Sequence, residues 1–258
     1  MSKDLVSIIM PSYNCGSFVE ETIRSVQAQT YQSWEIIFVD DCSNDQTMEI
    51  VMALREKDNR IKVFQNHHNS GAAVSRNLAL RKASGRWVAF LDSDDLWYPE
   101  KLEKQISFME NHSYSFSYTK TDVISESGEL QNFIWGGPKH ITKFGMYNYD
   151  WIGCLTVMYD VNVVGLIQIE DIKKNNDYAI WLKVIKKCDC YLLDEVLAKY
   201  RIRQGSISRH SKFKLIKWHY IMFRDAEKMG VIESLFNTVR NLFFGVLRRI
   251  IYKKRITK

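Results

Sequence analysis

The sequence predicts an α/β protein in which a mostly parallel sheet carries helices on both faces and is followed by a helical C-terminal segment. Two observations lead to this prediction. Over the first hundred residues, short apolar runs alternate with amphipathic stretches, as in repeated strand–helix units. Several apolar runs also end in carboxylate or amide side chains, and ligands bind at the carboxyl ends of strands in open α/β sheets.

The elements of the first half follow from these patterns. Apolar runs predict strands at 6–10, 35–39, 61–64 and 87–91. Apolar residues at helical spacing predict helices at 18–29, 46–56 and 72–82. Ser43 and Asp45 are capping candidates for the second helix, and Pro99 is expected at the first helical position of another that runs to about residue 111.

The strand–helix alternation stops after residue 112. Strands are predicted at 115–118, 156–159, 191–193 and 196–201, with a polar, glycine-containing region around 126–150. Helices are predicted at 178–187, 211–228 and 232–252. We therefore divide the chain into 1–112, 113–205 and a C-terminal extension, 206–258.

The composition is that of an ordinary globular protein with an uneven charge. The 258 residues are 46% hydrophobic and 26% charged. From Arg201 onward there are 15 Lys and Arg against 3 Asp and Glu, so this part carries +12 and the rest −6. A basic tail on an acidic body predicts contact with an anionic surface. The five Cys lack metal-ligand spacing and predict free thiols in a reducing compartment, and neither a signal peptide nor a membrane span is expected.

An acidic run, Asp92-Ser93-Asp94-Asp95, directly follows the predicted strand 87–91. Like charges at close range repel, so these carboxylates have little reason to gather for stability. A divalent cation would neutralise them, and Mg²⁺ and Mn²⁺ prefer oxygen ligands. The run therefore indicates a metal site, and the alternative is a solvated loop in which Asp95 caps the next helix.

Two earlier strand ends carry further polar groups. Pro11, Tyr13 and Asn14 follow the first strand, where a phenol ring can stack on a base. Asp41 follows the second strand and can accept a hydrogen bond from a uracil N–H or a ribose hydroxyl. The alternatives are an ordinary turn at the first strand and helix capping by Asp40, Asp41 or Ser43 at the second.

Two single residues near predicted helix starts complete the candidate site. Arg76 lies one turn into a helix opened by small residues, and both Arg and helix N-termini favour phosphate. Asp177 lies at the start of the helix 178–187, where the N-terminus keeps a carboxylate ionised and fixed, as a general base requires. A solvated Arg and a plain capping Asp are the alternatives.

These residues together resemble those of bacterial family 2 glycosyltransferases with the GT-A fold, the type that builds O-antigen and other surface polysaccharides. The resemblance spans roughly residues 5–205 and is strongest over the first hundred. It implies a GT-A glycosyltransferase domain at 1–205, with a nucleotide-sugar half at 1–112 and an acceptor half at 113–205. The remaining residues, 206–258, form the basic helical extension.

The resemblance also implies nucleotide-binding roles for single residues. Pro11 and Tyr13 match the loop that holds the nucleotide. Asp41 matches the acid that contacts uracil, and Arg76 matches a position near the diphosphate.

The metal and the base are implied in the same way. Asp92 and Asp94 match the D-x-D motif, in which Asp94 is the metal ligand and Asp92 lies near the ribose and donor sugar. Asp177 matches the second residue of the family's Glu-Asp motif, the general base. Asn176 stands where that motif has Glu, so a second carboxylate that would orient the acceptor is missing from the motif.

A last stretch, 200–208, resembles a family segment that closes over the diphosphate. It implies that Arg201 or Arg203 stabilises the leaving UDP, and the alternative is two solvated side chains. Negative charge develops on the UDP oxygens as the sugar leaves, and Mn²⁺ or Mg²⁺ and nearby Arg would absorb it. With one base and no apparent enzyme nucleophile, a single displacement would invert the anomeric centre.

The resulting hypothesis is an inverting, metal-dependent enzyme that moves a hexose-type sugar from a UDP-sugar to a polyprenyl-diphosphate-linked saccharide. One alternative is a sugar nucleotidyltransferase, which usually opens with a Gly-rich, Lys- or Arg-bearing loop, although 11–17 has neither cation. Another is a non-catalytic, membrane-associated binding subunit. No G-x-G-x-x-G or P-loop motif supports a dinucleotide enzyme or a P-loop kinase.

The predicted helix 232–252 combines many apolar residues with Arg240, Arg248 and Arg249. Such a helix can lie in a membrane interface with its cations on anionic headgroups, where a polyprenyl-linked acceptor is found. The alternative is a helix docked on the domain. We expect a cytoplasmic protein bound peripherally to the inner face of the cell membrane. No nucleic-acid partner is expected, because the acidic body lacks a basic groove.

Overall fold

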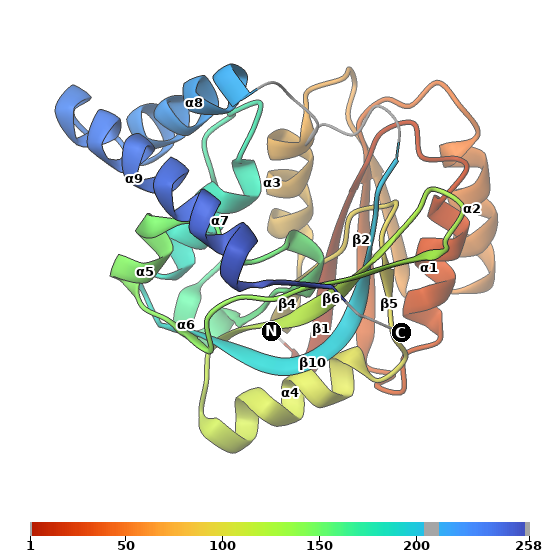
Figure 1. The fold of residues 1–258 in the computed structure, drawn as a ribbon. Helices are drawn as coiled ribbons and strands as arrows, with labels where there is room; N and C mark the ends of the chain where they lie inside the picture. The colour runs from red at the N-terminus through yellow and green to blue at the C-terminus, as the bar shows by residue number, and fades with distance from the viewer. Residues whose placement is uncertain (1, 204–211, 256–258) are drawn as a thin grey trace.

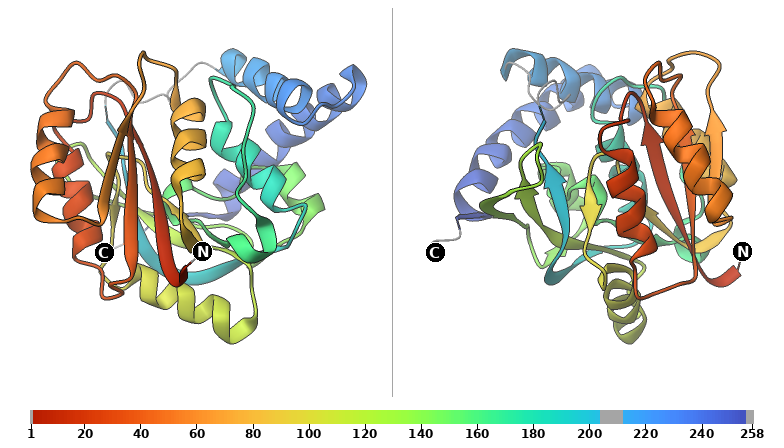
Figure 2. Two further views of the ribbon diagram at one scale, coloured as in Figure 1. Left: turned by 180° about the vertical axis from the view of Figure 1, so that it is seen from behind. Right: turned by 90° about the vertical axis from the view of Figure 1, so that its right-hand side faces the viewer.

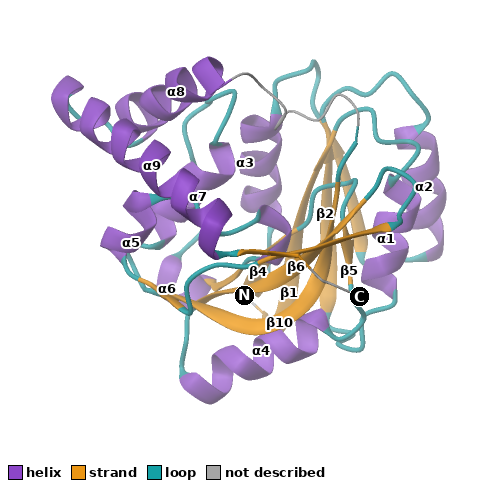
Figure 3. Ribbon diagram, in the orientation of Figure 1, coloured by secondary structure: helices purple, strands orange, loops and turns teal. Residues whose placement is uncertain are grey.

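The computed structural model describes residues 2–203 and 212–255, which form a mixed sheet covered by helices (Figure 1, Figure 3). The strands are β1 (Ser2–Ser12), β2 (Trp34–Asp40), β3 (Ile61–Gln65), β4 (Gly85–Phe90), β5 (Leu96–Trp97), β6 (Phe116–Ile124), β7 (Leu130–Trp135), β8 (His140–Ile141), β9 (Met158–Asp160), β10 (Cys190–Arg201) and β11 (Lys253–Arg255). The α-helices are α1 (Val19–Gln27), α2 (Thr47–Lys57), α3 (Ala72–Lys82), α4 (Lys101–His112), α5 (Lys143–Asn148), α6 (Val161–Val164), α7 (Asn176–Val184), α8 (Lys212–Ile221) and α9 (Val231–Ile251). Shorter helical turns are the 3₁₀ turn η1 (Cys154–Thr156) and the π-helical turn η2 (Met222–Ala226).

The sheet has the order β11-β7-β6-β9-β4-β1-β2-β3, and β10 pairs with β5, β6 and β8. Strands β1, β2, β3 and β4 pair in parallel, as the strand–helix alternation predicts. Of the other described pairs, only β6 with β10 is parallel. The α/β class is therefore confirmed, but the sheet is parallel mainly in its first half. A short turn such as that between β6 and β7 can join only antiparallel strands.

The two faces of the parallel strands carry different helices. In β1, Val6, Ile8 and Met10 belong to one core cluster with residues of α1 and α2, whereas Ile9 belongs to another with residues of α3. Figure 2 shows α1 and α2 on one side of these strands and α3 on the other. Alternate side chains of a strand point to opposite faces, so an uninterrupted apolar run satisfies both helical layers.

The second half departs from the predicted elements. The region 126–150, predicted to be polar and irregular, contains β7, β8 and α5. The two short strands predicted at 191–193 and 196–201 are one strand, β10, whose register against β6 shifts between Leu193 and Val196. Pro99 is not the first helical residue, because Lys101 N–H bonds the Tyr98 carbonyl in a turn and α4 begins only at Lys101.

The C-terminal segment packs on the rest of the protein. Met222, Phe223 and Ala226 are buried in the same core cluster as α3 and α7, and β11 pairs with β7. In the part of the chain that the structure describes, no helix is long and apolar enough to cross a membrane. Residues 204–208 of the segment expected to close over a diphosphate lie outside the described residues.

Lys101 is a fully buried ammonium at the start of α4. Its Nζ donates to Gln105 Oε1 at 2.8 Å and lies 4.1 Å from the centroid of the Trp97 ring. Burial lowers the pKa of Lys101 to about 7. Because this pKa is far below that of an exposed Lys, the unfolded chain binds an extra proton above neutral pH.

Replacing Lys101 with Met should therefore change how stability depends on pH. The wild type should gain up to about 1.4 kcal/mol of unfolding free energy per pH unit between roughly pH 7 and 8.5 from this group. Lys101→Met should lose that gain and be more stable than wild type at the acidic end. Urea denaturation across this range measures the slopes. The control is Lys104→Met. Lys104 lies on the same helix as Lys101, and its replacement removes a surface ion pair with Glu195. If Lys101→Met shows the same dependence of unfolding free energy on pH as wild type, the lowered pKa of Lys101 is wrong.

Candidate active site

The carboxyl ends of three parallel strands bring the predicted site residues to one edge of the sheet. Ser12 is in register with Asp40, and the Asp41 N–H donates to the Ser12 carbonyl at 2.8 Å. Pro11 is buried in β1, whereas the Tyr13 side chain that follows is 44% exposed. An exposed ring at this edge is available for stacking, but the nucleotide roles of both residues stay predictions.

Asp41 organises the loop before α3. Its Oδ1 accepts from Asn66 Nδ2 at 2.7 Å and from Ser70 N–H at 2.9 Å, and its Oδ2 accepts from Gly71 N–H at 2.7 Å. The carboxylate is thus a loop anchor, a use close to the capping alternative. A carboxylate has about four acceptor positions, so one remains for a nucleotide. Its contact with uracil stays a prediction.

Arg76 is buried between the D-x-D motif and α7. Its Nη2 lies 2.5 Å from Asp92 Oδ1, and its Nη1 donates to Asn176 Oδ1. Burial alone would lower the pKa of Arg76, but the negative charges of Asp92 and Asp177 help to raise it above its ordinary value. The guanidinium therefore stays charged and bonds Asn176, which lies a hundred positions further along the chain. Asn176, a departure from the Glu-Asp motif, serves here as the acceptor for this Arg.

Asp94 forms an ion pair with Arg203 at the same edge of the sheet. The distance from Arg203 Nε to Asp94 Oδ2 is 2.7 Å. Burial raises the pKa of Asp94; the positive charge of Arg203 opposes this rise and the negative charge of Asp92 adds to it. Burial therefore disfavours the ionised form of Asp94 more than Arg203 favours it, and a cation would stabilise that form.

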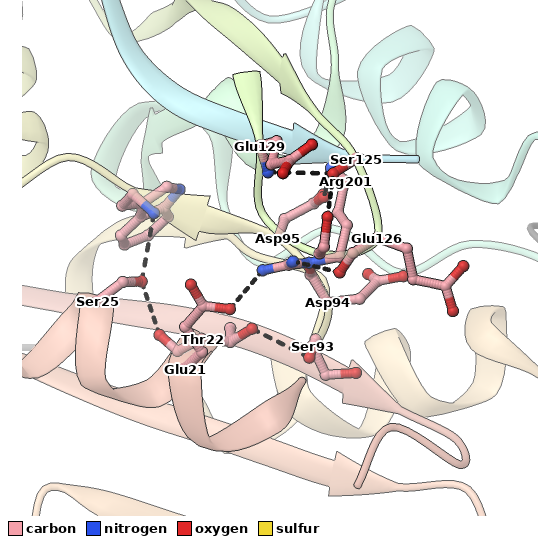
Figure 4. A network of polar contacts seen from close by, with 12 residues as sticks. Glu21, Thr22, Ser25, Ser93, Asp94, Asp95, Ser125, Glu126, Glu129 and Arg201 are labelled. Carbon is pink, nitrogen blue, oxygen red and sulfur yellow. Dashed lines mark hydrogen bonds and ion pairs between the residues drawn. The ribbon is translucent and has the colours of Figure 1, made fainter. Parts of the chain in front are cut away.

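Arg201 holds the acidic run in place (Figure 4). Its backbone N–H donates to Asp95 Oδ1 and its Nε to the Asp94 carbonyl, both at 2.8 Å. Its Nη1 donates to the Glu126 carbonyl at 2.9 Å, and its Nη2 pairs with Glu21 Oε2 at 2.6 Å. Asp95 is thus not the helix cap that the alternative interpretation expected: it is buried and accepts from the β10 backbone. Contact of Arg201 or Arg203 with UDP stays a prediction.

Asp177 lies in the first turn of α7 and is partly exposed. Its Oδ1 accepts from the Tyr178 N–H at 2.9 Å. Its charge and that of Asp92 both act on Arg76 and on the buried thiol of Cys154, whose pKa is raised well above its usual range by burial and then by Asp92. The predicted base and the D-x-D motif therefore belong to one site.

Three residues of the site had no signal in the sequence. Glu21 pairs with Arg201, Cys154 lies beside Arg76, and Asp150 lies near Asp177. Each comes from a separate segment without a motif. Only the position of Glu21 one turn into a predicted helix marked it as a surface carboxylate, which is no indication of its partner.

The residues present fit a divalent metal ion. Asp92 and Asp94 supply hard oxygen atoms at one strand end, where Arg76 and Arg203 contact one oxygen of each. In residues 2–203 and 212–255, no group of three or more His, Cys, Asp or Glu could hold a metal. The remaining ligands would come from water and the donor diphosphate, as Mg²⁺ sites commonly arrange.

Comparison with known proteins identifies the family. Residues 7–155 match the model described as Glycosyl transferase family 2. The putative teichuronic acid biosynthesis glycosyltransferase TuaG of Bacillus subtilis (strain 168) is 41% identical over 250 residues, which cover 96% of this chain and 98% of TuaG. The UDP-Glc:alpha-D-GlcNAc-diphosphoundecaprenol beta-1,3-glucosyltransferase WfgD of Escherichia coli is 39% identical over 227 residues, 87% of each chain.

A solved structure shows the same fold. S. aureus TarS 1-349 in complex with UDP-GlcNAc aligns with a TM-score of 0.71 and 24% identity over 93% of this chain and 73% of the TarS chain. The matching family model and the shared fold define a glycosyltransferase with the GT-A fold. The chain belongs to glycosyl transferase family 2, which confirms the family that the sequence resembles.

Arg201 should matter chiefly for stability. Arg201→Lys keeps the charge but loses the fork that reaches Asp94, Glu126 and Glu21 together, so unfolding free energy should fall by about 2–3 kcal/mol. Arg203→Lys, which disturbs one partly exposed ion pair, should cost less than about 1 kcal/mol. Urea denaturation of both variants measures the difference. Equal stability of Arg201→Lys and wild type would show that the network contributes nothing.

Proposed function

We propose that the chain is an inverting, metal-dependent glycosyltransferase that moves a hexose-type sugar from a UDP-sugar to a lipid-diphosphate-linked saccharide in surface polysaccharide synthesis. WfgD supports this donor and acceptor, because its name specifies UDP-Glc and a GlcNAc-diphosphoundecaprenol acceptor. TuaG, similar over nearly its whole length, supports the surface polysaccharide. The metal ion is Mn²⁺ or Mg²⁺, held by Asp94.

The observation that carries the proposal is the burial of Arg76 between Asp92 and Asn176. It ties the strand end that would hold the donor to the helix that carries Asp177. A donor bound at Asp92 then lies within reach of the base, which is the proximity that a single displacement needs.

The residues divide the work as follows. Asp92 lies on the ribose and donor-sugar side, held by Arg76. Asp177 removes the proton from the attacking acceptor hydroxyl while the bond from the anomeric carbon to the diphosphate breaks. Negative charge then develops on UDP, and Arg203 beside Asp94 lies on the side where it appears. A bound metal ion supplies additional positive charge for the diphosphate.

Two substitutions should separate donor binding from proton removal. Asp94→Asn should abolish transfer together with metal-dependent UDP binding. Asp177→Asn should lower kcat by roughly 10²–10⁴ and leave the affinity for UDP within about twofold, because only the base is lost. The assay offers Mn²⁺, a panel of UDP-sugars and a synthetic diphospho-lipid monosaccharide. NMR of the product determines the linkage and the anomeric configuration.

Asp189→Asn serves as the control, because Asp189 is an exposed carboxylate paired with His140. Its activity should equal that of the wild type. Full transfer by Asp94→Asn would refute metal dependence through this residue. A product that keeps the anomeric configuration of the donor would refute inversion.

The proposed acceptor is membrane-bound, and α9 has a face suited to a membrane. Its outer face is apolar and exposed, with Ile232 at 85% and Phe243 at 61%. The exposed apolar residues at helical spacing are Ile232, Leu235, Phe236, Val239, Phe243, Val246 and Ile250. Its inner face is polar, with Ser234, Asn237, Thr238 and Asn241 buried. From Ser234 to Asn241 the helix thus turns polar side chains to the protein, the reverse of a docked globular helix, whereas further along Phe244 packs on Trp151.

We infer that this outer face binds the anionic lipids on the inner side of the cell membrane. Exposed Phe144 of α5 extends the apolar surface, and Arg240 stacks on Phe144 and Phe236 beside it. The sequence adds Lys253, Lys254 and Arg255 after the helix. Apolar residues bordered by cations favour anionic interfaces over neutral ones. In Figure 1, α9 lies on the side of the molecule away from α1 and α2.

Phe243→Glu should weaken binding to anionic vesicles by roughly tenfold or more. It removes apolar area that would be buried in the membrane and adds a negative charge that the anionic lipids repel. Sedimentation with phosphatidylglycerol-containing vesicles measures the partition. The control, Met52→Glu, places the same charge on an exposed apolar position of α2 and should bind like wild type. Equal partition of Phe243→Glu and wild type would refute the membrane face.

A further inference from the structure

Three buried polar atoms without partners come from the end of α5, the residues just after it and the start of α7. Oδ1 of Asn148, Oδ1 of Asp150 and Nδ2 of Asn175 are each covered and have no hydrogen-bond partner among the described residues. Asn148 is the last residue of α5 and only 9% exposed, and Asn175 is the N-cap of α7. Buried polar groups are almost always bonded, and α5 packs against α7, so unbonded groups in these segments indicate a place for a polar ligand.

Of these residues, Asp150 lies near the predicted base, Asp177. Burial and then the charge of Asp150 raise the pKa of Tyr178, so Asp150 faces the first turn of α7, where Asp177 also lies. Tyr178 is itself fixed: its Oη donates to the Met146 carbonyl at 2.7 Å and accepts from Asn241 Nδ2 at 2.8 Å. The Asp150 carboxyl is therefore placed against a rigid support.

The position of Asp150 is unfavourable for the protein alone. Burial and then the charge of Asp177 raise the pKa of Asp150 well above its ordinary range. Arg248 of α9 and the Ile152 N–H oppose this rise only in part. Two carboxylates in proximity, one of them with an unbonded buried oxygen, destabilise the fold unless a ligand donates hydrogen bonds to them.

A second carboxylate is also what the Glu-Asp motif lacks here. Asn176 stands at its first position, and its amide oxygen accepts from Arg76. It therefore does not face an acceptor as a carboxylate. Asp150 comes from a different segment but lies near Asp177.

We propose that Asp150 binds the acceptor saccharide, accepting a hydrogen bond from a sugar hydroxyl beside the one that Asp177 deprotonates. Asn148 and Asn175 supply an amide acceptor and an amide donor to the same ring. A saccharide suits this group because each hydroxyl both donates and accepts. This inference rests on the proposed function and adds the residue that orients its acceptor.

The test compares steady-state kinetics of Asp150→Asn with wild type, varying the diphospho-lipid monosaccharide and the UDP-sugar in turn. KM for the acceptor should rise at least tenfold, whereas KM for the donor and the affinity for UDP should stay within twofold. The matched control is Asp122→Asn, because Asp122 is a buried carboxylate that accepts from Tyr98 Oη. It should not change KM for the acceptor.

A second measurement needs no substrate. Because the charge of Asp150 is unfavourable, Asp150→Asn should melt at the same temperature as wild type or higher at pH 8. If Asp150→Asn has the same KM for the acceptor as wild type, the inference is wrong. Asp150 would then bind only a buried water molecule and not the acceptor. An unfolded Asp150→Asn would also overturn the inference.

The two proposals fail in different ways. If wild type transfers sugar and Asp150→Asn keeps its acceptor kinetics, only the role of Asp150 is wrong. If folded wild type transfers sugar from no UDP donor to the diphospho-lipid acceptor, the proposed function fails and the inference falls with it.

Discussion

The structure depends on a buried guanidinium. Arg76 emerges from α3 and binds Asp92 at the end of a parallel strand and Asn176 at the start of α7. A buried cation is stable only when it is paired, so neither partner can move away without leaving it uncompensated. The contact fixes the end of β4, with Asp92, against the start of α7. The separation of the D-x-D motif from Asp177 follows from it.

The site concentrates negative charge that the fold only partly neutralises. Arg203 pairs with Asp94 and Arg201 holds Asp95, but the pKa of both carboxyls is raised, chiefly by burial. Asp150 shows the same pattern on the acceptor side. Such groups lower stability in the free protein, and diphosphate-bound cations or sugar hydroxyls would relieve that cost. The stability of the fold and the binding of its substrates therefore impose opposite demands on these few residues.

The C-terminal helix shows how tertiary packing can reverse the meaning of an amphipathic pattern. From the sequence, the apolar residues of 232–252 suited either a membrane or the core. In the structure, Asn241 bonds Tyr178 beneath the helix while Phe243 points outward. At Asn241, the polar side of the helix contacts the rest of the protein. Only the environment of each face, absent from a helical pattern, distinguishes the two interpretations.

The sequence alone determined the class of the fold, because hydrophobic periodicity reports directly which residues each strand and helix buries. It also located Tyr13, Asp41, Asp92 and Asp94, since polar residues directly after parallel strands must meet at one edge. Residues whose partners lie far along the chain were beyond it. Tertiary structure decided three contacts: Arg76 with Asn176, Arg201 with the acidic run, and Asp150 near Asp177. Those contacts exist only where separate segments pack together, and no local pattern specifies which segments meet.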